Sequence, residues 1–504
     1  MKFEVLPPNV GPAVFEKVLT RWSDIVGKDY VIHAADQLAP YRKIQIPIHE
    51  DLVAPSAVVM PDCVEQVREI LSVANDERIP LWTISTGRNF GYGSAAPPTR
   101  GQVVLDLRRM NRILDVNPDL CTALVEPGVS YGQLQAYIDE NRLPLCLCMP
   151  SAGPIAGLTG NSLERGLGYT GYGDHWGNVC GMEVMLADGT LVRTGMGGLP
   201  NQTTWQAFKY GFGPYLDGMF SQSNFGIVTK LGLWLMPKPE VTRSYRVSFP
   251  KRDDLGQIVE TTRRLRLHNI VPSVCMLAHA SVMVHGYGKF RRADVNPNGG
   301  RVSLQKIEEF GKQHGIGAWN NTVSFYGTEQ QVRASEDNAL AEFSKIGGTS
   351  LQLSTSPEAI GRAGFGAYHA YNWVGGGGSI WFVPVAPTLG EDAERQFSLG
   401  ESILAEYGFD YTGAFIVLGR DMHHMIHLLY DRSNPAEMKQ AHACFERLLK
   451  EFVGRGYGIY RVATAFMDQV AESYGPELRS LNGRLKRALD PNGILSPGKS
   501  GIYA

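Results

Sequence analysis

The sequence predicts an α+β fold organised in two units, and three observations support this. Short apolar runs of strand length alternate with helical patterns through the first unit. The pattern changes over Leu231–Glu240, where Pro237 and Pro239 indicate a boundary. A chain of 504 residues is expected to form two domains or one large one. We therefore predict one unit over residues 1–240 and a second over residues 241–459.

The first unit begins with a helix-rich segment, and an amphipathic helix follows it. Asp62 and Glu65 have the spacing of a capping box at the start of this helix. Its apolar residues fall on one face, namely Val64, Val67, Ile70, Leu71 and Ala74. The helix should end before Pro80, and the apolar residues up to Ile84 predict a strand. Two more strands are expected, over Val103–Leu107 and Thr122–Glu126.

A capped helix and a hairpin complete the pattern of the first unit. Ser130 lies three residues before Gln133, which is the spacing of a capping box for a helix over Tyr131–Glu140. Within Glu183–Thr194, the pair Asp188-Gly189 is typical of a tight hairpin turn. Both features depend on local chemistry, so their positions are sharply defined.

The second unit has the same mixed character. A long polar connection is expected over Lys289–Gly300. A strong helix is expected over Ala436–Phe452, and Gly454 and Gly456 should end it. The apolar residues on one face of this helix are Met438, Ala441, Phe445, Leu448, Leu449 and Phe452.

Composition and charge argue against several classes of protein. Hydrophobic residues make up 43% and charged residues 19%, which is typical of a globular protein. A net charge of −2 argues against nucleic acid as the main partner. No apolar run is long enough to span a membrane. The first residues lack the apolar core of a signal peptide, so a cytoplasmic location is expected.

The cysteines do not predict a disulfide framework or a metal site. There are 7, an odd number, scattered along the chain. Cys146 and Cys148 have the wrong spacing for a zinc knuckle. We expect reduced, mostly buried thiols. No CxxCH sequence is present, so a haem group would have to be carried by another chain.

The stretch Ser85–Pro98 is a glycine-rich loop placed between two predicted strands. Gly87, Gly91 and Gly93 allow positive φ values and bring backbone N–H groups to one side. Such a concave group of N–H donors binds phosphate oxygens. An ordinary surface turn is the alternative, but a plain turn has no need of the aromatic Tyr92 inside it.

This loop, GRNFGYGSAAP, resembles the pyrophosphate loop of the vanillyl-alcohol oxidase / p-cresol methylhydroxylase family of FAD enzymes. The resemblance continues in the family's order across nearly the whole chain. The further segments are LVEPGVSYGQL (124–134), GNSLERGLGYTGYGDH (160–175), DGMFSQSNFGIVTK (217–230), GGGGSIWFVPV (375–385), RDMHH (420–424), GYGIYR (456–461) and DPNGILSPGKSGI (490–502). Together these segments are highly specific.

The resemblance implies the fold and the division of labour within it. Residues 1–240 would form the FAD-binding domain, residues 241–459 a substrate cap domain, and residues 460–504 a return to the FAD-binding domain. The fold class is thus α+β, of the two-domain p-cresol methylhydroxylase type. The residues expected to bind FAD non-covalently are Ser85, Gly87, Arg88, Asn89, Gly91, Gly93, Pro127, Gly128, Gly160, Asn161, Gly226, Ile227 and Lys499.

The resemblance also implies the reaction, since the family oxidises para-alkylphenols. The substrate binds as a phenolate, and hydride leaves its benzylic carbon for flavin N5 to give a p-quinone methide. Water then adds, or a neighbouring proton is lost. Tyr92, Tyr460 and Arg461 match the phenolate-binding trio. Two hydroxyl donors and a permanently charged guanidinium suit an anion, because a free phenol ionises only near pH ~10.

Two carboxylates are matched to positions close to the flavin. Glu164 stands in GNSLERG, where the family usually carries an Asp beside flavin N5. Glutamate is one methylene longer, and a surface carboxylate paired with Arg165 is the alternative. Asp174 matches an acidic position near the flavin or substrate, although an Asp that caps a turn is nearly as good an interpretation.

The histidines of RDMHHMIH invite a metal interpretation, which we reject. His423 and His427 are four residues apart on a predicted helix and would share one of its faces. However, no HExxH pattern and no suitably spaced acidic residue accompanies them. In the family the first histidine of RDMHH lines the substrate pocket, so His423 is a pocket candidate, with an ordinary packed histidine as the alternative.

A covalent bond to FAD is implied by the stretch from Tyr371 to Trp381. The oxidase branch has a flavin-linked histidine where this chain has Ser379. The methylhydroxylase branch uses a tyrosine eight positions earlier, which is Tyr371. A tyrosyl ether through Tyr371 is therefore expected, with Tyr368 as the second candidate and non-covalent FAD as the alternative. The glycines before the strand allow close approach to a flat ligand, and Trp381 is expected on the pocket wall.

Two positions predict a larger substrate than cresol. The cresol-type members carry carboxylates at the positions that match Ala414 and His427. A small apolar residue in place of an acid should open an apolar space, which favours a longer para chain, of the eugenol type or a lignan. The base for water addition then stays open between His427 and Glu164.

Three hypotheses about the chain's role follow. In the first, electrons pass from FAD to a separate cytochrome c subunit, in the periplasm if the pair is exported. In the second, the chain is a free-standing oxidase that uses oxygen. In the third, it is a flavin-carrying assembly subunit without turnover, which the intact trio argues against. Ser379 with Tyr371 favours the first, and a homodimer of flavoprotein chains is expected.

Overall fold

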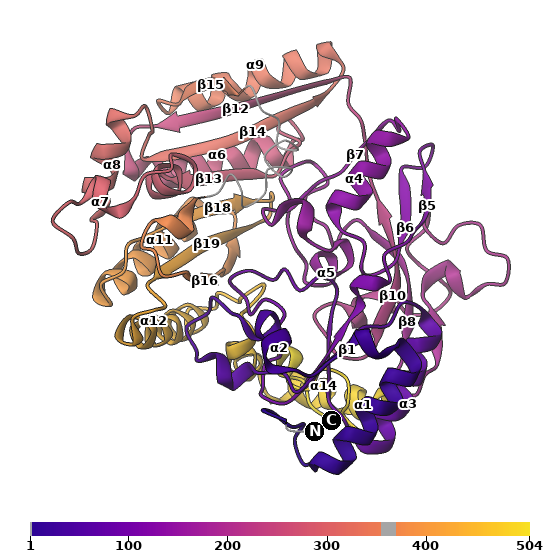
Figure 1. Cartoon of the computed structure of the whole chain (residues 1–504). Helices are drawn as coiled ribbons and strands as arrows, with labels where there is room; N and C mark the ends of the chain where they lie inside the picture. The colour runs from indigo at the N-terminus through magenta and orange to yellow at the C-terminus, as the bar shows by residue number, and fades with distance from the viewer. Residues whose placement is uncertain (1–2, 354–368) are drawn as a thin grey trace.

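The computed structural model describes residues 3–353 and 369–504, which form two α+β units side by side (Figure 1). The first unit holds a four-stranded and a five-stranded sheet, and the second is built on one eight-stranded sheet. In the described part of the chain, no helix combines the length and apolar character that a membrane crossing requires.

The four-stranded sheet has the order β1-β2-β4-β3, and its β2–β4 and β4–β3 pairings are parallel. Its strands are β1 Val31–Ile32, β2 Val58–Val59, β4 Val103–Asp106 and β3 Leu81–Ile84. The helices that accompany it are α1 Pro12–Val26, α2 Ala35–Arg42 and α3 Val64–Glu77. Helix α3 buries the predicted apolar face, but its N-cap is Cys63 and no side chain caps it, so the capping box of Asp62 and Glu65 is wrong.

The five-stranded sheet has the order β5-β6-β10-β8-β9, and all its pairings are antiparallel. Its strands are β5 Ile113–Asn117, β6 Thr122–Val125, β10 Ile227–Trp234, β8 Val179–Met185 and β9 Leu191–Arg193. The predicted hairpin is confirmed in β8 and β9. Helix α4 runs over Tyr131–Glu140, as predicted, and both hydrogen bonds of its Ser130–Gln133 capping box are present. The remaining elements are α5 Leu158–Leu163 and the short pair β7 Leu145–Cys146 and β11 Met236–Pro237.

The large sheet of the second unit has the order β15-β12-β14-β13-β18-β19-β16, with β17 beside β19. Its strands are β12 Val241–Phe249, β13 Cys275–His279, β14 Trp319–Gly327, β15 Thr349–Leu353, β16 Gly378–Phe382, β17 Val385–Pro387, β18 Gly413–Val417 and β19 Asp421–Tyr430. The helices are α6 Leu255–Leu267, α7 Arg292–Val295, α8 Leu304–Gln313, α9 Glu329–Lys345, α11 Gly390–Glu406 and α12 Pro435–Val453. The helix predicted over 436–452 is therefore confirmed, and the polar connection contains α7.

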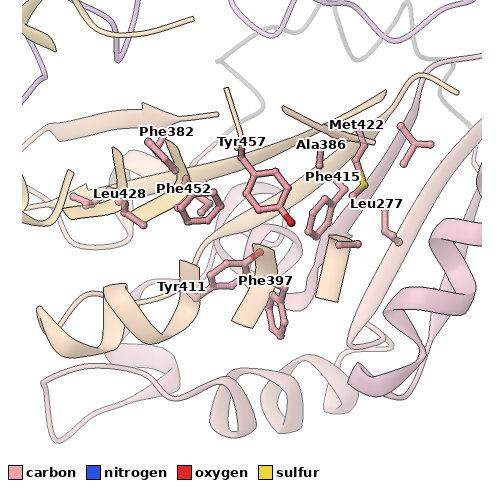
Figure 2. Close-up of a cluster of buried hydrophobic side chains, with 14 of the residues drawn as sticks. Leu277, Phe382, Ala386, Phe397, Tyr411, Phe415, Met422, Leu428, Phe452 and Tyr457 are labelled. Carbon is pink, nitrogen blue, oxygen red and sulfur yellow. The ribbon is translucent and has the colours of Figure 1, made fainter. Parts of the chain in front are cut away.

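One face of this sheet is closed by helices and forms the main core (Figure 2). Side chains alternate between the two faces of a strand. Phe415 of β18, Phe382 of β16 and Leu428 of β19 therefore point into this core, where aromatic rings from α11, α12 and the following segment meet them. Phe382, for example, makes edge-on contacts with Phe445 and Phe452. The opposite face of the same strands is left to form the wall of a cavity.

The last segment of the chain packs back onto the first unit. Helices α13 Met467–Ser473 and α14 Pro476–Leu489 lead to a stretch that lies along β3. The Leu81 N–H donates to the Ile494 carbonyl at 2.7 Å, and the Ser496 N–H donates to the Leu81 carbonyl at 2.6 Å. This pairing brings Lys499 to the loop that follows β3 and to the residues that precede β10.

Candidate active site

A cavity of about 310 Å³ lies where the loops of the first unit face the open side of the large sheet. Most residues selected from the sequence line it. Those from the first unit are Ser85, Gly87, Arg88, Asn89, Tyr92, Pro127, Gly160, Asn161, Glu164, Gly226 and Ile227. Those from the rest of the chain are Trp381, Ala414, His423, His427, Tyr460, Arg461 and Lys499. The volume and the mixed polar and apolar lining suit a small-molecule site.

The glycine-rich loop is shaped by close contacts with the second unit. Gly91 has φ +73°, and a Cβ there would overlap the indole ring of Trp381. The Gly91 N–H donates to Gln45 Oε1 at 3.0 Å. A Cβ on Gly93 would overlap the side chain of Thr464. Gly91 and Gly93 therefore hold the loop against its supports rather than lining the cavity themselves.

A second set of loops closes the cavity on the side of α5. Ser85 Oγ donates to the Pro127 carbonyl at 2.5 Å and lies so close to Gly157 that no side chain would fit there. Gly160 also approaches Ser85. Gly128 lies behind this layer, against the carbonyls of Leu107 and Arg108, and does not line the cavity.

These residues fit FAD. Thr159 Oγ1 and Asn224 Oδ1 are buried polar atoms on the cavity lining that lack a hydrogen-bond partner within the described residues. Unpaired buried polar atoms are rare unless a ligand meets them. The cationic side chains of Arg88 and Lys499 and the N–H groups of the glycine-rich loop suit a diphosphate and an electron-rich ring system.

Tyr92, Tyr460 and Arg461 meet at one end of the cavity, as the sequence predicts. The Arg461 guanidinium lies 4.5 Å from the centre of the Tyr92 ring and donates to Asn89 Oδ1. Burial raises the pKa of Tyr92 well above its usual value, and a hydrogen bond with Tyr460 adds to the shift. Tyr92 therefore stays protonated and acts as a donor. Burial works against the charge of Arg461, but Glu164 and the two tyrosines outweigh it and raise the pKa of the guanidinium.

Glu164 is paired with two cations at the cavity wall. Its carboxylate accepts from Lys499 Nζ, and its Oε2 lies 3.8 Å from Arg461 Nε. Burial opposes ionisation of Glu164, but the charges of Lys499 and Arg461 outweigh burial and hold the pKa of the carboxyl below its usual value. The alternative of a surface pair with Arg165 is not found, since the Arg165 Nε donates to Ser221 Oγ at 2.8 Å.

The histidine segment is a strand, so the helical interpretation of His423 and His427 is wrong. Both lie on β19 and, being four residues apart on a strand, share the face that lines the cavity. His424 points to the core, where its ring stacks on Phe415 at 4.2 Å. Among the described residues, no three His, Cys, Asp or Glu side chains are grouped as a metal site requires.

The cavity wall around Ala414 is apolar. Ala414 and Ile416 of β18, Met276 of β13 and Met425 of β19 all line it, and Ala414 pairs with Met425 in the sheet. A more polar strip follows, in which the rings of Trp381 and His427 stack with centroids 3.6 Å apart. His427 Nε2 and Ser379 Oγ are 2.7 Å apart. Burial lowers the pKa of His427 well below its usual value, with His285 adding to the shift.

Tyr371 lies one layer behind the cavity wall. Its ring stands edge-on to His427, which does line the cavity, with centroids 5.9 Å apart. Burial raises the pKa of Tyr371 to about 12, and hydrogen bonds with Ser379 and Gln45 act in the opposite direction. The second candidate for flavin attachment, Tyr368, lies outside the described residues.

Asp174 does not belong to the cavity. Its side chain is exposed, and its Oδ1 accepts from the Gly177 N–H at 2.9 Å. This is the arrangement of a turn-capping Asp, so the prediction of a pocket residue is wrong and the alternative describes the structure.

Several residues at the site were not predicted from the sequence, and three of them support residues that were. Gln45, from the N-terminal segment, supports Gly91. Gln222 Nε2 donates to the Tyr460 carbonyl at 2.8 Å and fixes the segment that carries the trio. Asp421 Oδ2 lies 3.2 Å from His423 Nε2. Asp421 stands in the quoted segment RDMHH and was available as a signal, whereas the contacts of Gln45 and Gln222 are between distant parts of the chain.

Comparison with known proteins places this cavity in a family. Residues 55–195 match the family described as FAD binding domain, and residues 238–500 match FAD linked oxidases, C-terminal domain. The 4-cresol dehydrogenase [hydroxylating] flavoprotein subunit of Pseudomonas putida is 46% identical over 99% of this chain and 98% of its own length. The chain belongs to the vanillyl-alcohol oxidase / p-cresol methylhydroxylase family. It is therefore an FAD-dependent oxidoreductase.

Two solved structures of this family resemble the chain along its whole length. A crystal structure of p-cresol methylhydroxylase with substrate bound has a TM-score of 0.96 and 46% identity, with 99% of each chain covered. A 4-ethylphenol oxidase from Gulosibacter chungangensis, in an isoeugenol complex, has a TM-score of 0.94 and 34% identity, again with 99% of each chain covered. The predicted two-domain FAD-binding fold is thus confirmed.

Proposed function

We propose that this protein oxidises para-alkylphenols at the benzylic carbon, with FAD as the hydride acceptor. The observation that carries the proposal is the convergence of Tyr92, Tyr460 and Arg461 at one end of the cavity. The names of its relatives, a 4-cresol dehydrogenase and a 4-ethylphenol oxidase, support the same substrate class.

The trio would stabilise the substrate as its phenolate. Tyr92 keeps its proton because burial raises its pKa, so it donates a hydrogen bond to the substrate oxygen. Arg461 supplies a full positive charge. Its guanidinium is paired with Glu164, and Lys499 in turn donates a hydrogen bond to Glu164. Charge-assisted contacts of this kind favour the anion over the neutral phenol. A phenolate releases a benzylic hydride far more readily than a phenol, because its negative charge stabilises the resulting p-quinone methide.

FAD, when bound, supplies the acceptor for that hydride. The chain's own residues hold the phenolate oxygen at the trio and orient the substrate ring along the cavity wall that His427 lines. Addition of water to the quinone methide then needs a proton acceptor on the wall. His427, Glu164 and His423 all line the cavity. Glu164 is held as a carboxylate by its two cations, and burial makes His427 a weak base.

We further propose that the substrate is bulkier than cresol. The apolar surface at Ala414, Met276, Ile416 and Met425 is the support, because it accommodates a longer para chain of the propenyl- or allylphenol type, or a lignan. We also propose that Tyr371 forms an ether to FAD and that a cytochrome c subunit takes the electrons. The relative from Pseudomonas putida is a flavoprotein subunit, which supports a partner chain. Oxygen as the acceptor is the alternative, because another relative is an oxidase.

Stopped-flow reduction tests this function. The FAD-loaded protein is mixed anaerobically with 4-methylphenol and, separately, with a methoxylated allylphenol, and flavin bleaching is followed. Rapid bleaching by either phenol is expected. The reduced protein is then mixed with oxygen or with cytochrome c, and faster reoxidation by cytochrome c is expected. Absence of bleaching with every 4-alkylphenol would contradict the proposal, whereas fast reoxidation by oxygen would select the oxidase alternative.

A further inference from the structure

His423 stands at the end of the cavity that holds the proposed phenolate site. Its ring lies 4.7 Å from the ring of Tyr460, measured between centroids. It is buried and lines the cavity. Its cross-strand neighbours, Ile416 of β18 and Val385 of β17, are uncharged. The titratable groups packed against the imidazole are therefore Tyr460 on one side and Asp421 on the other.

The contact with Asp421 fixes how this histidine can act. Asp421 Oδ2 lies 3.2 Å from His423 Nε2. An ionised carboxylate accepts hydrogen bonds and cannot donate, so Nε2 carries a hydrogen, and in the neutral imidazole Nδ1 then keeps its lone pair. Nδ1 is buried and has no hydrogen-bond partner among the described residues. The chain thus presents a proton acceptor inside the cavity, backed by a carboxylate.

Asp421 connects this acceptor to the solvent. Its side chain is 47% exposed, whereas that of His423 is 9% exposed. The hydrogen bond from His423 is the main cause that lowers the pKa of Asp421, so the carboxylate is ionised at neutral pH. When His423 takes up a proton at Nδ1, it can pass its Nε2 proton to Asp421. The exposed carboxyl group of Asp421 then releases that proton to bulk water.

The proposed phenolate site needs such a route. A substrate that enters as a phenol must lose its proton in an enclosed cavity. Tyr92 and Arg461 are both donors and cannot accept this proton. Burial raises the pKa of Tyr92, and Glu164 helps to raise the pKa of Arg461. Glu164 is held ionised by Lys499 and is a poor acceptor. His424 on the same strand points to the core.

We propose that His423 and Asp421 form a proton relay that carries the phenolic proton of the substrate from the cavity to solvent. The O–H bond of the phenol breaks and its electron pair stays on oxygen, which Tyr92, Tyr460 and Arg461 hold. The proton passes to His423 Nδ1, either directly or through the hydroxyl of Tyr460, and the Nε2 proton leaves through Asp421. His423 is a catalytic residue in this scheme and Asp421 a positioning residue. The inference rests on the proposed phenolate function.

Proton release on ligand binding tests the relay without any turnover. The FAD-loaded protein is mixed in a stopped-flow instrument with 4-hydroxybenzonitrile, a phenol without a benzylic hydrogen, in weak buffer that contains a pH indicator. Wild type should release about one proton per site as the bound ligand ionises. Asp421→Asn and His423→Gln should slow this release roughly 100-fold, the size of a general-base effect. Asp421→Glu should restore most of the rate.

Two controls separate a relay from a structural role. Asp253→Asn removes an exposed carboxylate from the same unit and should leave proton release unchanged. Added imidazole buffer should speed release in Asp421→Asn, since a free base replaces the missing route. Release at the wild-type rate in Asp421→Asn and His423→Gln, or equal slowing in Asp253→Asn, would overturn the relay. If the wild-type protein binds the ligand as neutral phenol, the proposed phenolate site itself is wrong. That result differs from the two outcomes that would overturn only the relay.

Discussion

Tyr371 stands edge-on to His427, with ring centroids 5.9 Å apart, and Ser379 Oγ lies 2.7 Å from the Nε2 of the same histidine. Ser379, which stands where the resemblance places the flavin-linked histidine of the oxidase branch, also hydrogen-bonds with Tyr371. This arrangement places the side chains of Tyr371 and Ser379 directly behind the imidazole of His427, which lines the cavity.

The first prediction is that the flavin is covalently bound through Tyr371. The yellow colour of the protein should survive acid precipitation, and a tryptic peptide with Tyr371 should carry the mass of FAD. Tyr371→Phe should fold and bind FAD non-covalently, with slower turnover, because the attachment but not the cavity is lost. Flavin that washes off the denatured wild-type protein, or a link to another residue, would refute this.

The second prediction concerns Arg461, whose charge the trio depends on. Arg461→Ala should reduce kcat/KM for a 4-alkylphenol. The lost transition-state stabilisation should be about 2–3 kcal/mol, the contribution of one charge-assisted contact. Arg461→Lys should restore little, because an ammonium lacks the planar fork that reaches both Asn89 and the substrate. Flavin content and the melting temperature should change little in both variants. Wild-type oxidation by Arg461→Ala would show that the phenolate lies elsewhere.

A third prediction follows from the buried histidines. Burial lowers the pKa of His424 to about 3 and that of His175 to about 4, against a usual value of 6.5. A lowered histidine pKa means that the unfolded chain binds protons that the folded chain does not. Stability is therefore full above pH 6.5 and falls as the pH drops below it. The loss is about 2 kcal/mol for each such histidine between pH 7 and pH 5.

Urea unfolding at several pH values measures this effect. His424→Leu should reduce the slope of unfolding free energy against pH by about one proton between pH 5 and pH 6.5. It should also lower stability at pH 7, because the contact of His424 Nε2 with the Tyr411 hydroxyl at 2.8 Å is lost. The exposed His268 offers a matched control, and His268→Leu should leave the slope unchanged. Equal slopes for wild type and His424→Leu would mean that His424 is charged in the folded protein.

The features that the sequence predicted well are those set by local chemistry. The Ser130–Gln133 capping box defines α4, and Asp188-Gly189 closes the hairpin of β8 and β9. The glycine-rich loop was also found from spacing alone. The resemblance to a known family then selected the trio, in which Tyr92 lies far from Tyr460 and Arg461 in the sequence and meets them only in the folded chain.

The failures have physical reasons of their own. His423 and His427 were placed on a helix because their spacing fits one, but β18 and β16 pair with this segment on both sides and make it a strand. Residues four apart also share a face on a strand. The two histidines therefore both line the cavity, although the helical interpretation was wrong. Asp421 was missed because its contact with His423 and its exposure to solvent depend on β19, which begins at this residue. Asp174 was misplaced because a turn-capping Asp and a ligand-binding Asp look the same in a sequence.

The last prediction is about substrate size. Ala414 lies on β18 opposite Met425, with Met276 and Ile416 beside it on the cavity wall. An apolar wall gains about 0.8 kcal/mol for each substrate methylene that it buries, which is about fourfold in affinity. The side chain of an allylphenol has two more carbons than a methyl group, so we expect kcat/KM to favour a methoxylated allylphenol over 4-methylphenol by roughly tenfold or more.

Two substitutions separate volume from polarity at this wall. Ala414→Leu should reduce the preference for the longer chain by filling the space, without adding charge. Ala414→Glu should reduce it further and disfavour any apolar chain, because a buried carboxylate resists apolar contact. Ala278, which pairs with Ala414 in the sheet but does not line the cavity, is the matched control, and Ala278→Ser should keep the wild-type preference. Wild-type protein that clearly prefers 4-methylphenol would show that Ala414 does not open the pocket, whatever the variants do.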